Sequence, residues 1–581
     1  MNPNGRDAQA SAKAAEAIRV GLAIRVGFRI GEIESEVTRE PLTLAAGFWL
    51  LVGAAILASP MLGPPVLASP VLASPVLASP ISPPATSAPS TSLPSTSAPS
   101  TSPASTSAPP NVVLIMADDL GWRDVGFRGS EIRTPQIDRI ATQGIRLERF
   151  YVQPICSPTR AAVMTGKSPA RLGIVQPISK LDPTGLPLDE KILPQYLAAV
   201  GYQALMVGKW HLGHRQRRYF PQARGFEHFY GHVTGGIGYW DHNHGGGHDW
   251  QRNGVTVRES GYATRLIADE ALRLLETRDK ARPTFLFASF NAPHLPNEAP
   301  EATIAAYPES LDARRRIHAG MVAELDTAIG RILAKLEAEG MGDDTLVWFF
   351  SDNGGLNPSA NPEGLVSAMN FLVSIFGEPL PVEALEFLRT NVQDGASDNA
   401  PLREGKGSVY EGGIRVPSAL WWPGHTRPGT SSVFVTAQDV LPTLLQAAGV
   451  SEMIPSGLDG VGRWREILEG ENTAGQGARP PDFRVQGLGG VALIRSPWKL
   501  VVPSPPPFGD PKPELYEIYQ DPEEKRDRAA EQPGRVAELL AVLEAWPLGP
   551  EIHAPLTQIF FDPDAFGGGE EDREPWAEAA E

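Results

Sequence analysis

Two pairs of oxygen-bearing side chains follow short apolar runs of the sequence. Asp118 and Asp119 follow one run, and Asp352 and Asn353 follow another. Each pair alone is also typical of a turn or a helix cap. Together they offer only oxygen ligands, which suit Ca²⁺ or Mg²⁺ and do not suit Zn²⁺. The pattern therefore indicates a site for a hard divalent cation.

Basic side chains follow two further apolar runs. Lys209 and His211 come after the run 202–208, and His294 comes after the run 284–290. Lysine and histidine after a strand are commonly solvated loop residues. Beside a cation and its carboxylates, they indicate a site that holds an anion and transfers protons.

The only cysteine of the chain, Cys156, lies in the segment PICSPTRAAVMTGK. One cysteine forms no intramolecular disulfide, and a lone cysteine is most often an inert buried thiol. Ser157 and Pro158 have the pattern of an N-cap followed by a first-turn proline, which predicts that a helix starts here. Cys156 is then placed at a helix N-terminus, where an anion is stabilised. Taken alone, this position favours an activated thiol.

The elements that must position these residues are strands and helices in alternation. Runs with apolar side chains on both faces predict buried, mostly parallel strands. Amphipathic helices are expected over 262–277 and 314–339, so the pattern predicts an α/β layer fold. Ligand sites of open α/β sheets lie beyond the carboxyl ends of the strands, where these residues should converge. The four predicted strands are 111–117, 202–208, 284–290 and 345–350.

The segment CSPTR (156–160), followed by Thr165 and Gly166, resembles the C-x-P-x-R activation motif of the sulfatase family. The resemblance covers the chain from about residue 111 to its C-terminus. The stretch HLGHRQRRYFPQARGFEHFYGH looks closest to the arylsulfatase B branch. Further segments resemble family motifs in order: ADDLGW (117–122), GKWHLG (208–213), APH (292–294), SDNGG (351–355), LREGKGSVYEGGIRVP (402–417) and ELYEIYQDPEEKRD (514–527).

This resemblance implies a fold, an activity and two non-protein requirements. The fold would be an alkaline-phosphatase-like α/β/α sandwich around a large, mostly parallel sheet, with a smaller C-terminal antiparallel-sheet subdomain. The activity would be hydrolysis of a sulfate monoester of an aryl alcohol or a sugar. A formylglycine-generating enzyme would convert Cys156 to formylglycine, whose hydrate is the nucleophile. One Ca²⁺ ion would be bound, with Mg²⁺ as the alternative.

The resemblance also implies a role for each matching residue. Arg160 and Lys209 would hold and polarise the oxygens of the nucleophile, and Lys209 and Lys406 would bind the sulfate. His211 would be the base that releases sulfate from the enzyme. His294, helped by Lys406, would protonate the leaving alcohol. The metal ligands would be Asp118, Asp119, Asp352, Asn353 and the converted Cys156.

The overall composition limits the partners of the protein. The 581 residues suffice for one large domain and a smaller one, and 42% hydrophobic with 20% charged residues is ordinary for a globular protein. A formal net charge of −17 argues against nucleic acid as a partner. An anionic substrate then requires a locally basic pocket, which Arg160, Lys209 and Lys406 would supply.

The N-terminal part has three segments with different compositions. Residues 1–40 form a charged extension, and 41–60 contain an apolar run that predicts a signal peptide or a membrane anchor. Residues 61–110 are rich in Pro, Ser, Thr and Ala, which predicts a disordered linker. The protein is therefore expected to be exported, as a periplasmic, secreted or membrane-anchored protein.

The rest of the chain is expected to form a catalytic domain over 111–475 with an insertion at 356–400. The insertion would form one or two helices near the site mouth, or contact a membrane or a partner. A C-terminal subdomain at 476–565 would contain an antiparallel sheet closed by a helix at 533–545. An acidic tail, 566–581, is predicted to be disordered.

Two points stay open at this level. The Gly/His-rich stretch 238–250, with His242, His244 and His248, favours a substrate-contacting rim, and a second metal site is the alternative. The main alternative function is that of a phosphonate monoester hydrolase or phosphodiesterase of the alkaline phosphatase superfamily, some of which share the C-x-P-x-R motif. A further alternative to a sulfatase is a non-catalytic binding protein that has the sulfatase fold.

Overall fold

The computed structural model describes residues 109–179, 182–244, 247–357, 395–469, 481–487, 489–503, 512–550 and 552. The predicted N-terminal extension, the apolar segment, nearly all of the linker, most of the insertion and the acidic tail lie outside the described residues. The chain divides into two compact units, Met1–Thr106 and Ser107–Glu581, and every element named below belongs to the second.

A ten-stranded sheet forms the centre of this unit, in the order β13-β2-β12-β11-β1-β10-β4-β5-β8-β9. Its five middle strands run parallel to one another. Four of them are the predicted strands, each found within about one residue of its expected bounds. The parallel strands are β11 (Thr345–Ser351), β1 (Asn111–Ala117), β10 (Thr284–Ser289), β4 (Gln203–Lys209) and β5 (His228–His232).

Shorter strands complete both edges of the sheet. β12 is antiparallel to β11 and to β2, whereas β13 runs parallel to β2. On the other edge, β8 is antiparallel to β5 and to β9. These edge strands are β12 (Ser418–Trp421), β2 (Ile145–Leu147), β13 (Gly429–Ser431), β8 (Gln251–Arg252) and β9 (Val255–Thr256).

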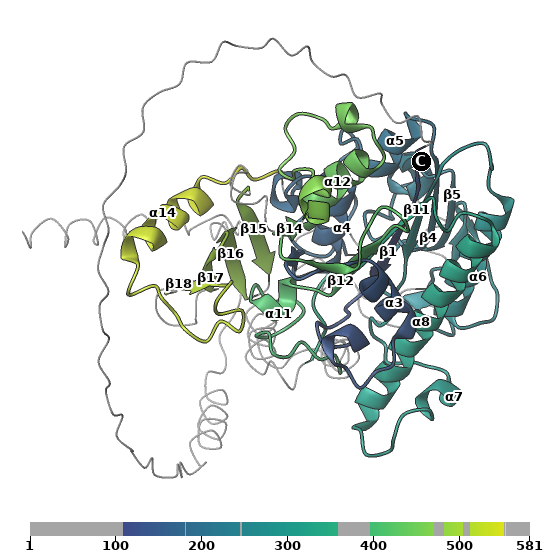
Figure 1. Cartoon of the computed structure of the whole chain (residues 1–581), viewed down its shortest axis with the longest axis horizontal. Coiled ribbons are helices and arrows are strands. Elements are labelled where there is room, and N and C mark those ends of the chain that lie inside the picture. The colour runs from purple at the N-terminus through teal and green to yellow at the C-terminus, as the bar shows by residue number, and fades with distance from the viewer. Residues whose placement is uncertain are drawn as a thin grey trace, which may run out of the picture. The chain divides into compact units, whose positions relative to one another are not determined.

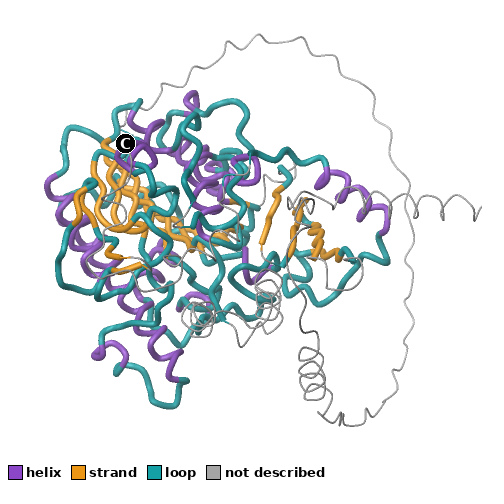
Figure 2. The backbone as a smooth tube through the Cα atoms, turned by 180° about the vertical axis from the view of Figure 1, so that it is seen from behind, coloured by secondary structure: helices purple, strands orange, loops and turns teal. Residues whose placement is uncertain are grey.

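Helices cover both faces of the sheet, because the central strands are apolar on both sides (Figures 1 and 2). On β1, Leu114 and Met116 belong to one buried cluster, and Val113 and Ile115 belong to the other. Each such side chain stabilises the fold by about 1.5–3 kcal/mol when fully buried. The first face packs against α4 (Cys156–Thr165), α5 (Leu193–Ala198) and α12 (Val440–Ala447), and the second against α3 (Pro135–Gln143), α6 (Ala263–Thr277) and α8 (Ala313–Ala338).

A separate four-stranded antiparallel sheet forms the C-terminal part. One of its faces packs with Leu539 of α14 (Pro533–Glu544), and the other packs with Tyr151 and Phe434 of the larger part. The predicted C-terminal sheet and its closing helix are therefore confirmed. The strands are β15 (Phe483–Gly487), β16 (Gly490–Arg495), β17 (Trp498–Pro503) and β18 (Glu514–Glu517).

The remaining elements are short. Two small sheets pair β3 (Phe150–Tyr151) with β14 (Val435–Thr436), and β6 (Asn243–His244) with β7 (Gly247–His248). Within the ranges that the structure describes, no helix has both the length and the apolar character that crossing a membrane needs. The short helices are α7 (Glu301–Ile304), α11 (Glu411–Ile414), α13 (Trp464–Glu469), and the 3-10 turns η1 (Gly126–Arg128), η2 (Pro169–Leu172), η3 (Arg217–Tyr219), η4 (Pro221–Arg224), η6 (Ala437–Asp439) and η7 (Ser451–Met453).

Candidate active site

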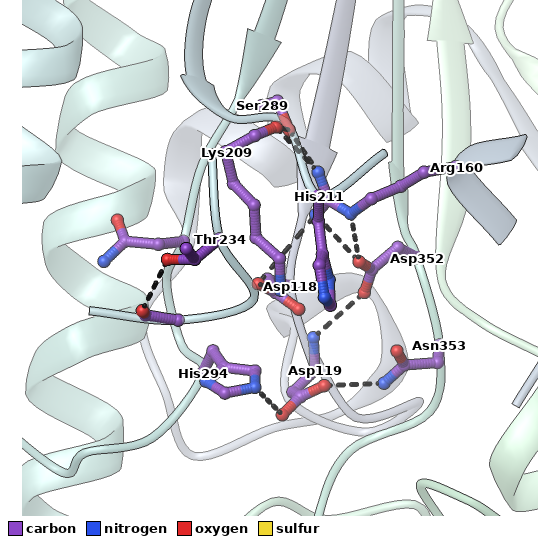
Figure 3. Close-up of polar contacts among 12 residues, drawn as sticks. Asp118, Asp119, Arg160, Lys209, His211, Thr234, Ser289, His294, Asp352 and Asn353 are labelled. Atoms are coloured by element: carbon purple, nitrogen blue, oxygen red, sulfur yellow. Dashed lines mark hydrogen bonds and ion pairs between the residues drawn. The ribbon is translucent and has the colours of Figure 1, made fainter. Parts of the chain in front are cut away.

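The predicted site residues meet at the carboxyl edge of the central sheet (Figure 3). Asp118 and Asp119 follow β1, and Asp352 and Asn353 belong to the segment that follows β11. The last residues of these two strands pair with each other, so the four side chains are brought side by side. Convergence at this edge is what a parallel sheet imposes on residues far apart in sequence.

The oxygen ligands form a compact group. One carboxylate oxygen each of Asp118 and Asp352 and the Sγ of Cys156 lie within 4.8 Å of one another. The Nδ2 of Asn353 donates to Asp119 Oδ1 at 2.7 Å, which turns the amide oxygen away from that carboxylate. Asp118 Oδ1 and Asn353 Oδ1 are buried and have no hydrogen-bond partner among the residues that the structure describes. Because buried oxygens without partners are costly, this donor set fits a hard cation such as Ca²⁺ or Mg²⁺.

Arg160, in the first half of α4, donates hydrogen bonds to several residues of the site. Its Nε and Nη2 donate to Asp352 Oδ2 at 3.0 and 2.8 Å. Its Nη1 donates to the backbone oxygen of Lys209 at 2.9 Å and to Ser289 Oγ at 2.7 Å. Burial and the neighbouring carboxylate of Asp118 raise the pKa of Asp352 to about 6, with Arg160 opposing them. The guanidinium therefore joins three strand ends through one planar fork.

Two lysines bind the aspartate pair. Lys209 Nζ lies 2.5 Å from Asp118 Oδ2, and Lys406 Nζ lies 2.7 Å from Asp119 Oδ2. Burial disfavours the charge of Lys406, but Asp119 holds its pKa above the ordinary value. Burial likewise opposes the charge of Asp119, yet Lys406 and His294 hold its pKa well below the ordinary range. The site is thus densely charged with both signs.

His211 is neutral with one free nitrogen. Its Nε2 donates to the backbone oxygen of Ile178 at 3.0 Å, which fixes the tautomer. Its Nδ1 is buried and has no hydrogen-bond partner within the described part of the chain. Burial, followed by the charges of Lys209 and Arg160, lowers the pKa of His211 well below its usual value. A neutral imidazole with an unused lone pair suits a base.

His294 is held differently. Its Nδ1 donates to the backbone oxygen of Leu295 at 2.7 Å, and its Nε2 lies 3.7 Å from Asp119 Oδ2. Burial, followed by the charge of Lys406, lowers the pKa of His294 to about 3. The ring is therefore neutral at neutral pH. It can donate a proton only after taking one up, which a bound anion beside it favours.

Backbone strain is concentrated at two of these residues. Asp119 has φ 66° and His211 has φ 56°, in the left-handed region that residues other than glycine seldom adopt. Such conformations cost about 1–3 kcal/mol and persist where the surrounding structure enforces them, as at functional sites.

Cys156 is the first residue of α4, and its thiol is deeply buried. Burial raises the pKa of the thiol, and Asp118 and Asp352 add to this effect while Lys209 and Lys406 oppose it. The helix N-terminus does not by itself activate the thiol, because the thiolate is disfavoured at this position.

The predicted start of α4 was wrong by two residues. Ile155, with φ −144° and ψ 151°, is the N-cap, and Ser157 lies inside the helix. The hydroxyl of Ser157 donates to the backbone oxygen of His211 at 3.0 Å and accepts from the N–H of Ile178 at 3.0 Å. Its side chain is engaged in long-range bonds that hold His211, so it does not cap its own helix.

The Gly/His-rich stretch 238–250 holds its histidines with backbone oxygens. His242 Nε2 lies 3.1 Å from the backbone oxygen of Gly261, and His248 Nε2 lies 2.9 Å from that of Val257. Among the described residues, the groups able to hold a metal ion include none of His242, His244 and His248. The second metal site that the sequence left open is therefore not formed by the described side chains.

Several residues of the site were not found from the sequence. Ser289 accepts from Arg160 and donates to the backbone oxygen of Lys209 at 2.8 Å. Gly235 and Gly236 pack against the two histidines, and Asp249 accepts from the N–H groups of Val233 and Thr234 just before them. The glycine pair indicates a loop, and its local sequence does not specify which group either glycine contacts. The serine lies within a predicted strand and carries no comparable signal.

The fold and the site define the alkaline-phosphatase-like α/β/α class. Residues 110–450, more than half of the chain, match the sulfatase family model. The chain belongs to the sulfatase family, as its motifs predicted. The placement in the arylsulfatase B branch stays a prediction.

Known relatives agree with this family. Mouse arylsulfatase J is 34% identical over 376 residues, which is 63% of this chain and 56% of that protein. Human N-acetylgalactosamine-6-sulfatase is 31% identical over 385 residues, which is 62% of this chain and 66% of that protein. The matches thus span between about half and two thirds of the relatives' length.

Solved structures resemble the fold over a larger share. The crystal structure of Ps i-CgsB in complex with k-i-k-neocarrahexaose has a TM-score of 0.65 and 28% sequence identity, covering 79% of this chain and 98% of that chain. The PsFucS1 sulfatase from Pseudoalteromonas sp. shares the fold with a TM-score of 0.57 at 23% identity, covering 75% and 89%. The predicted fold class is therefore confirmed.

Proposed function

We propose that this protein hydrolyses sulfate monoesters of sugars or aryl alcohols, using a formylglycine made from Cys156 and one divalent cation. The observation that carries the proposal is the grouping of Cys156 with Asp118 and Asp352, in a site where Asp118 Oδ1 and Asn353 Oδ1 are buried without a hydrogen-bond partner among the described residues. Basic groups surround this meeting point, as an anionic ester requires. The names of the relatives, an arylsulfatase and an N-acetylgalactosamine-6-sulfatase, support the same substrate class.

The cation would be calcium, with magnesium as the alternative, and its ligands would be the oxygens of the two acidic segments and of the converted residue. When bound, it would oppose negative charge on the sulfate and on the nucleophile. The hydrated aldehyde would supply one hydroxyl that attacks sulfur and a second whose deprotonation releases sulfate. The ligand oxygens are Asp118, Asp119, Asp352 and Asn353 together with residue 156.

The basic side chains of the chain orient and neutralise the ester. Arg160 is fixed by its two bonds to Asp352, so it presents charge beside Cys156 without a cost in side-chain freedom. Lys209 and Lys406 lie on opposite members of the aspartate pair and can each reach an oxygen of the sulfate. Positioned charges of this kind stabilise the developing negative charge of the transition state.

The two histidines divide the proton transfers. His211, neutral with a free Nδ1, takes a proton so that sulfate can leave the enzyme. His294, close to Lys406 and Asp119, delivers a proton to the leaving alcohol after taking one up with the anionic substrate. One imidazole would accept a proton and the other would donate one, as a two-step hydrolysis requires.

Maturation and location follow from the same proposal. A formylglycine-generating enzyme would convert Cys156 to formylglycine. The apolar segment 42–58 would direct export, and the protein would be periplasmic, secreted or anchored to a membrane. No nucleic acid is expected as a partner of a chain with a net charge of −17.

A direct test is mass spectrometry of the tryptic peptide 150–160 from protein made in its active host. We expect the mass of an aldehyde in place of the thiol, and steady hydrolysis of aryl and sugar sulfates. An unmodified thiol in active protein would refute the aldehyde. Faster turnover of phosphonate monoesters or phosphate diesters than of any sulfate ester would refute the substrate class.

The Cys156→Ser variant tests the need for the second hydroxyl. Its serine can accept a sulfuryl group but has no neighbouring hydroxyl to expel sulfate, so the sulfated peptide 150–160 should accumulate after one turnover. Continued turnover at the wild-type rate would contradict the mechanism.

A further inference from the structure

A short segment after β5 runs against both catalytic histidines. We call residues 234–236, Thr234-Gly235-Gly236, the glycine strap. A Cβ atom added to Gly235 would lie 2.8 Å from His211 Cε1 and Nε2. A Cβ atom added to Gly236 would lie 3.0 Å from His294 Cε1 and 3.1 Å from its Nδ1. The bare backbone of the strap therefore packs directly on both imidazole rings.

The two residues just before the strap are hydrogen-bonded to the segment that carries Lys209 and His211. The N–H of Trp210 donates to the backbone oxygen of His232 at 3.0 Å, and the N–H of His211 donates to that of Val233 at 3.2 Å. These two hydrogen bonds hold the start of the strap close to the ring of His211. The strap then continues to the ring of His294.

Asp249 anchors the beginning of the strap. Its carboxylate accepts from the N–H of Val233 at 3.1 Å and from the N–H of Thr234 at 2.8 Å. The hydroxyl of Thr234 donates to the same carboxylate. Asp249 is completely buried, so these contacts are shielded from water and fix the strap firmly. Thr234 itself lies beside the catalytic group (Figure 3).

We propose that the glycine strap is a positioning element that sets the orientation of His211 through Gly235 and of His294 through Gly236, with Asp249 as its anchor. This inference rests on the proposed function for the roles of the two histidines. The two glycines then act on different steps. Gly236 governs proton delivery to the leaving alcohol, and Gly235 governs the later release of sulfate.

Alanine substitutions separate the two effects. Gly236→Ala displaces the ring that protonates the alcohol, so its loss of kcat should grow as the leaving alcohol becomes more basic, reaching about 100-fold for a sugar sulfate. Gly235→Ala should lower kcat to a similar extent for every ester, with a burst of alcohol in the first turnover. Asp249→Asn releases the whole strap and should show both defects. Gly534→Ala, where no atom lies within 4 Å of the added Cβ, is the matched control.

A second measurement does not depend on activity. In protein carrying ¹⁵N-labelled histidine, Gly235→Ala should shift the imidazole resonances of His211, and Gly236→Ala those of His294, with neither shifted in Gly534→Ala. Resonances that stay unchanged in both strap variants, or equal leaving-group dependence of Gly235→Ala and Gly236→Ala, would overturn the assignment. If the labelled rings respond as expected and no sulfate ester is hydrolysed, the proposed function fails and the strap contact stands.

Discussion

Lys499 connects the C-terminal sheet to the catalytic part through charges that are wholly buried. This residue of β17 is 0% exposed, and its Nζ lies 3.1 Å from Glu411 Oε1 and 2.7 Å from Glu524 Oε1. Glu411 belongs to α11, close to Lys406, and also accepts from the hydroxyl of Tyr151 at 2.8 Å. Replacing Lys499 by methionine keeps the length of the side chain and removes its charge.

The expected cost follows from burial. Removing one partner of a buried ion pair leaves an uncompensated charge and destabilises a protein by about 3–5 kcal/mol. The control variant Lys280→Met breaks a contact of the same 3.1 Å length to Glu339, but the side chain of Lys280 is 66% exposed. Exposed pairs of this kind contribute at most about 1 kcal/mol. Lys499→Met should therefore lower the free energy of unfolding several times more than Lys280→Met.

The cost should also depend on pH. Burial and the charge of Glu411 raise the pKa of Glu524 to about 7, and Lys499 opposes this shift. Without Lys499 the pKa of Glu524 rises further, so the folded variant retains a proton that the unfolded chain has lost. Stability from such a raised carboxyl pKa is present at low pH and disappears as the pH rises through the folded pKa. The loss in Lys499→Met should be greater at pH 8 than at pH 6.

Native-state hydrogen exchange of the β17 amides measures this loss as a change in opening free energy. The double variant Lys499→Met/Glu524→Gln should recover part of it, because one of the two stranded carboxylates is gone. The reasoning would be refuted if Lys499→Met lost no more stability than Lys280→Met, or lost the same amount at both pH values.

Three further outcomes are expected. Arg160→Lys keeps the charge but loses the two-point contact with Asp352, so kcat/KM for an aryl sulfate should fall by about 100-fold or more in a steady-state assay. Asp326 is buried and accepts from the N–H groups of Gln136 and Ile137 in the first turn of α3, and burial raises its pKa to about 7. The wild type should therefore lose more stability than Asp326→Asn as the pH rises from 4 toward 8, as thermal unfolding of both across this range will show. Calcium should raise the melting temperature of the wild type, by the equivalent of about 2.7 kcal/mol at a hundred times Kd, and should raise it much less in Asp118→Asn.

The middle of the fold was predictable because its strands are apolar on both faces. The runs that became β1, β4, β10 and β11 have polar side chains only at or beside their ends, so their length and composition indicated strands directly. β5, with the sequence HFYGH, was not predicted, because two histidines and a glycine hide its pattern. Its neighbour β4 supplies the pairing that makes it a strand.

Site residues whose type and order along the chain define the chemistry could be predicted from the sequence. Residues that act through tertiary packing could not. The contact of Gly235 with His211 depends on how β5 lies beside β4, which no local pattern specifies. The Lys499–Glu411–Glu524 cluster was missed for another reason. Charged residues are normally expected at the surface, and these three lie far apart in the sequence, so only the packed structure shows that they share one buried position.

The balance of charges explains why the cation and the substrate should depend on each other. The carboxylates of Asp118, Asp119 and Asp352 face the cationic groups of Lys209, Lys406 and Arg160, so the side chains of the site nearly neutralise one another. A sulfate ester approaching a protein with a net charge of −17 would gain little from such a balanced site. A divalent cation bound by these carboxylates would add two positive charges to the site. The ammonium groups of Lys209 and Lys406 would then be less fully neutralised by the aspartates and more available to the sulfate, so substrate binding is expected to depend on the cation.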